Sequence, residues 1–70
     1  MNIRLMSEDE LATHIEDLAG SGARRAVAER LAADAWADGA RTIADLDARW
    51  SSDDAFFAAY AAAAADVEAE

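Results

Sequence analysis

Apolar residues recur at helical spacing along most of the chain, and the first segment shows this most clearly. Ser7 and Glu10 have the spacing of a capping box, which satisfies backbone N–H groups at the start of a helix. Gly20 supplies a left-handed stop. Residues 8–19 are therefore predicted to form an amphipathic helix with one apolar stripe. The stripe consists of Leu11, Ile15 and Leu18.

The second segment, residues 23–38, has two apolar faces rather than one. A helix that is apolar on two sides is typical of the central element of a bundle, where more than one neighbour packs on it. The two faces consist of Val27, Leu31 and Ala35, and of Ala28, Ala32 and Trp36.

Two further helices are predicted in the remainder of the chain. The third covers residues 42–50, and the fourth carries Asp53 and Asp54 in its first turn, where carboxylates interact favourably with the helix dipole. Their starts are assigned to Thr42 or Arg41, and to Ser51 or Ser52. The inner positions are Ile43, Leu46 and Trp50 in the third helix, and Phe56, Tyr60, Ala64 and Val67 in the fourth, flanked by Phe57 and Ala61.

Residues 1–6 differ from the rest, because Ile3 and Leu5 alternate with polar residues as in a strand. No second strand is predicted to pair with them, so they are expected to form an extended arm that packs on the bundle or pairs with another molecule. The predicted fold is all-α: one domain over residues 1–70, built as a small bundle of three to four short helices with an extended N-terminal arm.

Composition makes this a protein of modest stability. The chain has 70 residues, which allows one domain, and 21 of its apolar residues are alanine. It contains no cysteine, so neither a disulfide nor a cysteine zinc site reinforces the fold, and a cytoplasmic location is expected. No signal peptide and no membrane-spanning segment is predicted.

The net charge of the chain limits the kinds of partner that it can bind. Fifteen acidic residues against six basic ones give a net charge of −9, which argues against direct binding to nucleic acid or to an anionic membrane. The excess lies entirely in residues 1–20 and 51–70, so the first and last helices would form one acidic side if they are neighbours. The expected partner is a protein with a basic surface.

Some of these charges are expected to pair and others are not. Glu16 and Asp17 lie at the end of the first helix and Arg24 and Arg25 at the start of the second, where each pair opposes the helix dipole, so the four are predicted to form a clamp. No internal counter-ion is evident for the last acids of the chain. A basic surface of another protein could supply their counter-ions, or they form a frayed, solubilising tail. They are Asp66, Glu68 and Glu70.

Catalytic chemistry has almost no candidates in this sequence. Cysteine and lysine are absent, and His14 is the only histidine. Glu10, His14 and Asp17 share a helix face, but surface Glu–His pairing explains that spacing better than a metal site does. No enzyme activity, no metal and no cofactor is predicted.

Two apolar features suggest contact with another protein. Phe56 and Phe57 differ by about 100° around a helix, so both cannot point inward, and Phe57 or Trp36 is a candidate exposed anchor. The last helix also has a smooth outer face of small residues, which would let another helix, including one from a second copy of the chain, approach closely. This face consists of Ala55, Ala58, Ala59, Ala62, Ala65 and Ala69.

In its size, its acidity and its lack of catalytic residues, the chain resembles the small acidic inhibitors that phages encode against bacterial defence, including anti-CRISPR proteins and DNA mimics. The resemblance lies in size and composition, not in a motif. It implies inhibition of a nucleic-acid-binding surface on a nuclease or surveillance complex. The residues assigned to the partner are Asp9, Glu10, Glu16, Asp17, Asp53, Asp54, Asp66, Glu68, Trp36 and Phe57.

The main alternative is a regulatory or adaptor module that binds through its aromatic and alanine faces. An antitoxin, an anti-sigma-like factor or a homodimerising helical domain would be of this kind. A third interpretation, the leader of a peptide precursor, fits the acidic start of the first helix but not the aromatic second half of the chain.

Overall fold

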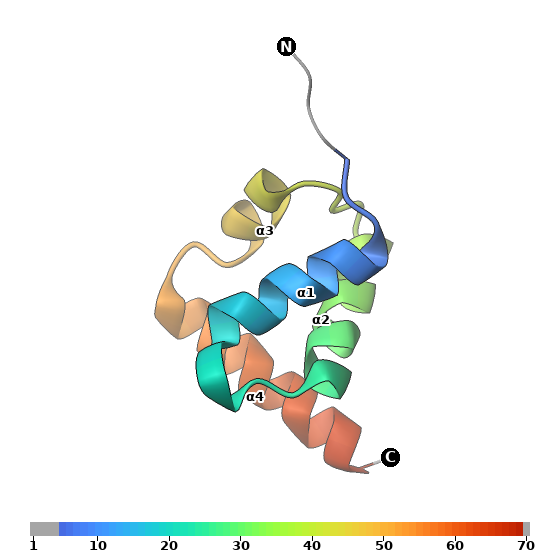
Figure 1. The fold of residues 1–70 in the computed structure, drawn as a ribbon. Coiled ribbons are helices and arrows are strands. Elements are labelled where there is room, and N and C mark those ends of the chain that lie inside the picture. Colours follow the sequence, from blue (N-terminus) through green and yellow to red (C-terminus); the bar gives the residue numbers. More distant parts are fainter. Residues whose placement is uncertain (1–4, 70) are drawn as a thin grey trace.

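A computed structural model describes residues 5–69, and within this range the chain forms four α-helices and no strand (Figure 1). This confirms the predicted small all-α bundle. The helices are α1 (Glu8–Ala19), α2 (Arg25–Ala37), α3 (Ile43–Arg49) and α4 (Asp53–Ala69), and a 3₁₀ turn, η1 (Gly20–Gly22), follows α1.

Helix α2 is the central element, as its two apolar faces predict. It packs against α1 on one side and α4 on another (Figure 1). Most of its buried side chains are small. The buried residues of α2 are Val27, Ala28, Leu31, Ala32 and Ala35.

Helix α1 begins with the predicted capping box. The Glu10 N–H donates to the Ser7 hydroxyl over 3.1 Å, and the Ser7 N–H donates to the Glu10 carboxylate over 3.2 Å. Leu11 and Ile15 are fully buried, but the prediction for Leu18 is wrong, since this side chain is 44% exposed. It lines a groove beside α3 and the start of α4 instead of entering the core.

The connection from α1 to α2 differs from the expected one. Gly20 ends α1 with a positive φ of 84°, which favours glycine, but its ψ of −157° lies outside the left-handed helical region. Arg24 is extended, and its N–H donates to the Tyr60 hydroxyl of α4 over 2.8 Å. Helix α2 therefore begins at Arg25, two residues later than predicted, because the preceding backbone is bonded across the bundle.

Side-chain caps fix the starts of α3 and α4. Thr42 is the N-cap of α3, and its hydroxyl accepts from the Asp45 N–H over 3.1 Å. Ser52 plays the same part before α4, where its hydroxyl accepts from the Ala55 N–H. Ile43 was expected to face the core, and this is wrong: it is 46% exposed in the first turn of α3, and Leu46 is the buried residue of this helix.

The inner face of α4 is narrower than predicted. Phe56 and Ala63 are buried, whereas Ala61 is exposed and Phe57 is 49% exposed. The other inner positions are half-buried against the core, and they are Tyr60, Ala64 and Val67.

Residues Leu5 and Met6 are the described part of the predicted arm, the rest of which lies outside the described residues. Met6 is buried, and its N–H donates to the Arg41 carbonyl over 2.7 Å, so this end of the arm is attached to the α2–α3 connection. Over residues 5–69, no helix combines the length and the apolar content needed to cross a lipid bilayer.

Replacement of Leu31 by Ala should lower the free energy of unfolding by about 2–4 kcal/mol, because it leaves a cavity at the centre of a thin core. Chemical denaturation measures this. Leu5→Ala is the control, since Leu5 is 68% exposed and its loss should cost less than about 0.5 kcal/mol. Equal losses in the two variants would contradict the central position of α2.

Candidate functional site

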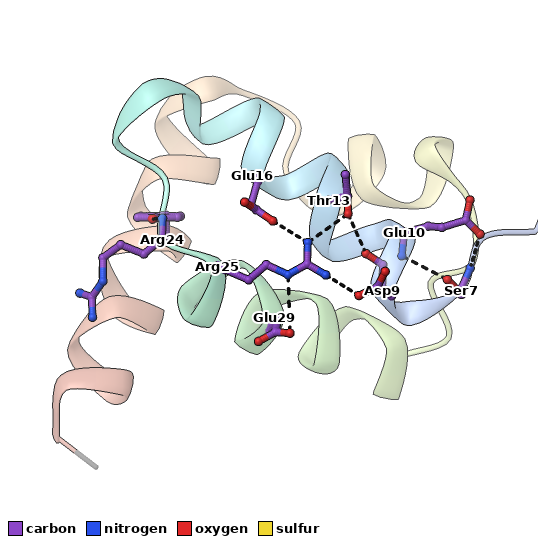
Figure 2. A network of polar contacts seen from close by, with 9 residues as sticks. Ser7, Asp9, Glu10, Thr13, Glu16, Arg24, Arg25 and Glu29 are labelled. Carbon is purple, nitrogen blue, oxygen red and sulfur yellow. Dashed lines mark hydrogen bonds and ion pairs between the residues drawn. The ribbon is translucent and has the colours of Figure 1, made fainter.

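Arg25 joins the start of α2 to α1 through several carboxylates. Its guanidinium group forms ion pairs with Asp9 and Glu16 and lies 3.6 Å from Glu29, and it donates to the Thr13 hydroxyl over 3.0 Å (Figure 2). The hydrogen bond to Glu16 is the main cause that raises the pKa of Arg25 above its usual value. Two of the acids predicted to meet a partner, Asp9 and Glu16, are therefore paired within the chain.

The predicted clamp forms only in part. Glu16 pairs with Arg25 as expected, but Arg24 points away from this network toward α4, where it lies 2.9 Å from Glu68 (Figure 2). Asp17 has no hydrogen-bond or ion-pair partner among the described residues. Adjacent side chains of an extended residue and a first helical residue diverge, so one arginine serves α1 and the other serves α4.

The expectation that the last acids lack internal counter-ions is wrong for the two that the structure describes. Glu68 pairs with Arg24, and Asp66 lies 3.8 Å from Arg30. Both carboxylates remain largely exposed, so each pair contributes little to stability. Glu70 lies outside the described residues.

The arginines of α2 thus reach both terminal helices, and the excess charge does not gather on one side formed by α1 and α4. The acids left over are those that form neither an ion pair nor a hydrogen bond within the described chain, and we call them the unpaired carboxylates. They are Glu8, Asp17, Asp34, Asp47, Asp53 and Asp54.

Asp17, Asp53 and Asp54 were assigned to a partner from the sequence, although Asp17 was also expected to pair within the clamp. Asp47 was not assigned, nor were Glu8 and Asp34. The segment that contains Asp47 carries equal numbers of acids and arginines, which indicated local balance. In the structure Arg49 pairs with Asp38 over 2.6 Å and Arg41 binds backbone carbonyls, so neither arginine neutralises Asp47.

Trp36 and Phe57 differ as candidate anchors. The guanidinium carbon of Arg41 lies 3.5 Å from the centre of the Trp36 ring, so a cation–π contact already covers one face of this half-buried side chain. Phe57 keeps half of its surface exposed and stands edge-on to Phe56, with the ring centres 5.2 Å apart. Phe57 is the more accessible of the two.

The face shared by Glu10, His14 and Asp17 forms a shallow depression with Met6 and Thr13. Glu10 serves the capping box, and the His14 Nε2 is buried without a hydrogen-bond partner in the described chain. No group of three or more metal-ligating side chains occurs among residues 5–69.

Asp45 holds the start of α3, the helix that carries Asp47. The Arg41 N–H donates to its carboxylate over 2.8 Å, and the Thr42 N–H donates to it over 3.2 Å. The bond from the Arg41 N–H is the main cause that lowers the pKa of Asp45.

Comparison of the chain with protein families, with curated proteins and with solved structures finds no match.

Arg25→Met should lower stability more than Arg24→Met, because it leaves three carboxylates close together without their cation, whereas Arg24→Met loses one exposed pair and keeps the bond to Tyr60. The urea midpoints of the two variants measure the difference. High salt should reduce the difference between the two urea midpoints, because salt screens the repulsion among the exposed carboxylates. Equal midpoints would contradict the central role of Arg25.

Because of Asp45, the stability of the chain should decrease as the pH falls into the acid range. Because its pKa is lower in the folded chain, its contribution is complete above its unfolded pKa of about 4 and is lost as the pH falls through its folded pKa. Asp45→Asn should therefore show a shallower loss of stability below about pH 4 than the unsubstituted chain. Asp47→Asn, on the same helix but without a hydrogen bond, is the matched control, and an identical slope in both variants would refute the assignment.

Proposed function

We propose that this chain is a non-enzymatic binding protein that engages a basic surface of a protein partner in the cytoplasm and inhibits it. One observation carries the proposal: within the described chain every arginine is already engaged internally, while the unpaired carboxylates face solvent. Over residues 5–69 the chain therefore presents anionic groups without an arginine that is left unengaged. Such a surface attracts and orients a basic partner over a distance.

A nucleic-acid-binding surface is the kind of target that fits this charge. Carboxylates one helical turn apart lie about 5–6 Å from each other, a spacing that can meet lysine and arginine groups arranged for phosphates. Inhibition of the DNA-mimic or anti-CRISPR type would follow if the chain occupies the site of the nucleic acid.

The alternative, a regulatory or dimerising helical module, has an observation of its own in α4. Most of its smooth outer face is exposed, which leaves room for another helix, and the exposed residues are Ala55, Ala58, Ala62, Ala65 and Ala69. Binding through this face would be apolar and would change little with salt.

Capture of the partner from the organism that encodes the chain, followed by measurement of the association rate against salt, separates the two functions. Amide replacement of all the unpaired carboxylates should slow association and flatten its salt dependence without loss of the helical circular dichroism spectrum. A variant with Gln at Ala58 and Ala62 is the control, and its binding should be unchanged. If the amide variant binds normally and the glutamine variant does not, the proposal is wrong and the adaptor function replaces it.

A further inference from the structure

A groove of about 150 Å³ is lined by residues from the end of α1, from α3 and its connection to α4, and from the start of α4. Its floor is formed by Leu46 and Phe56, which are 1% and 5% exposed. Leu18, which is 44% exposed, and the half-buried Trp50 line it as well. The groove is thus mixed in character and open to solvent: Leu46 and Phe56 give it an apolar floor, and serines and aspartates complete its lining. Leu18, which was expected in the core, lies along it.

Two of the six unpaired carboxylates, Asp47 and Asp53, line the groove. Asp54 follows Asp53 in the first turn of α4, and Asp17 lines the depression beside His14. The remaining unpaired carboxylates, Glu8 and Asp34, line other depressions.

The aromatic side of the groove is held by ring contacts. Trp50 and Phe56 meet edge to face with ring centres 5.4 Å apart, and Phe56 meets Phe57 in the same manner. Rings packed in this way keep their positions, so a ligand would not have to order them, and this lowers the entropic cost of binding.

We propose that this groove binds a segment of the basic partner in which one branched aliphatic side chain lies between arginines or lysines. The volume of about 150 Å³ has room for one aliphatic side chain, which would lie against Leu18, Leu46 and Phe56. The cations would meet Asp47 and Asp53, which have no counter-ion within the described chain. This inference rests on the proposed function and names the site and the chemistry of the partner.

A second copy of the chain fits the groove less well than such a segment. Each described arginine is engaged internally, so the described surface of a second copy would bring further carboxylates to Asp47 and Asp53 without a free arginine. Like charges in an apolar contact oppose association.

The test uses two blocked peptides with the ¹⁵N-labelled chain, followed by NMR at low salt. One peptide has a leucine between two pairs of arginines, and the other has a serine in place of the leucine. The leucine peptide should shift the indole signal of Trp50 and the amide signals around Leu18, and it should bind about tenfold more tightly than the serine peptide, because only leucine buries apolar surface.

Matched variants locate the binding site. Asp47→Asn with Asp53→Asn should weaken the leucine peptide about fivefold, whereas Glu8→Gln with Asp34→Asn, which removes the same charge outside the groove, should leave binding unchanged. Leu18→Gln should weaken the leucine peptide and not the serine peptide. Leu18 is exposed, so this variant is expected to fold.

Three results would overturn the groove as the site: equal affinity for the two peptides, equal weakening by the two pairs of acid substitutions, or no shift at Trp50 with millimolar peptide. None of them decides the proposed function, which stands or falls with the salt response of the captured partner. Conversely, the leucine peptide could bind at the groove while the captured partner binds the amide variant as well as the unsubstituted chain. That result would retain the groove as a binding site and reject the proposed function.

Discussion

The packing of small side chains along α2 is the constraint on which the rest of the structure depends. Ala28, Ala32 and Ala35 are fully buried beside Val27 and Leu31 in the core that α2 shares with α1 and α4. Because α2 packs against both neighbours, the arginines at its start are within reach of both terminal helices. Arg25 binds carboxylates of α1, and Arg24 binds Glu68 of α4.

This arrangement decides which charges remain for a partner. The arginines at the start of α2 and within it form ion pairs with acids of α1 and α4. Only part of the negative charge of these two helices is therefore left without a counter-ion. Two of the carboxylates that remain unpaired, Asp47 and Asp53, line the groove at the start of α4, together with Leu18 and the Trp50–Phe56 pair. Apolar surface and negative charge coincide there, which is the combination that an amphipathic basic segment requires.

Much of the fold could be predicted from the sequence because its signals are local. The capping box of Ser7 and Glu10 and the two apolar faces of α2 depend on neighbouring residues alone, and both predictions are confirmed. The candidate site depends on contacts between distant residues. Helical periodicity cannot show that Leu18 lies beside α3 and α4, and local charge balance concealed Asp47 because Arg49 pairs with Asp38 instead.

The structure of the chain bound to the protein that it captures is the most direct test of the central claim, that unpaired carboxylates and a groove with an apolar floor together bind a basic partner. We predict an aliphatic side chain of the partner between Leu18 and Trp50, with lysine or arginine nitrogens within ion-pair distance of Asp47 or Asp53. A partner seated on the alanine face of α4, with the groove open and these carboxylates in solvent, would contradict the account.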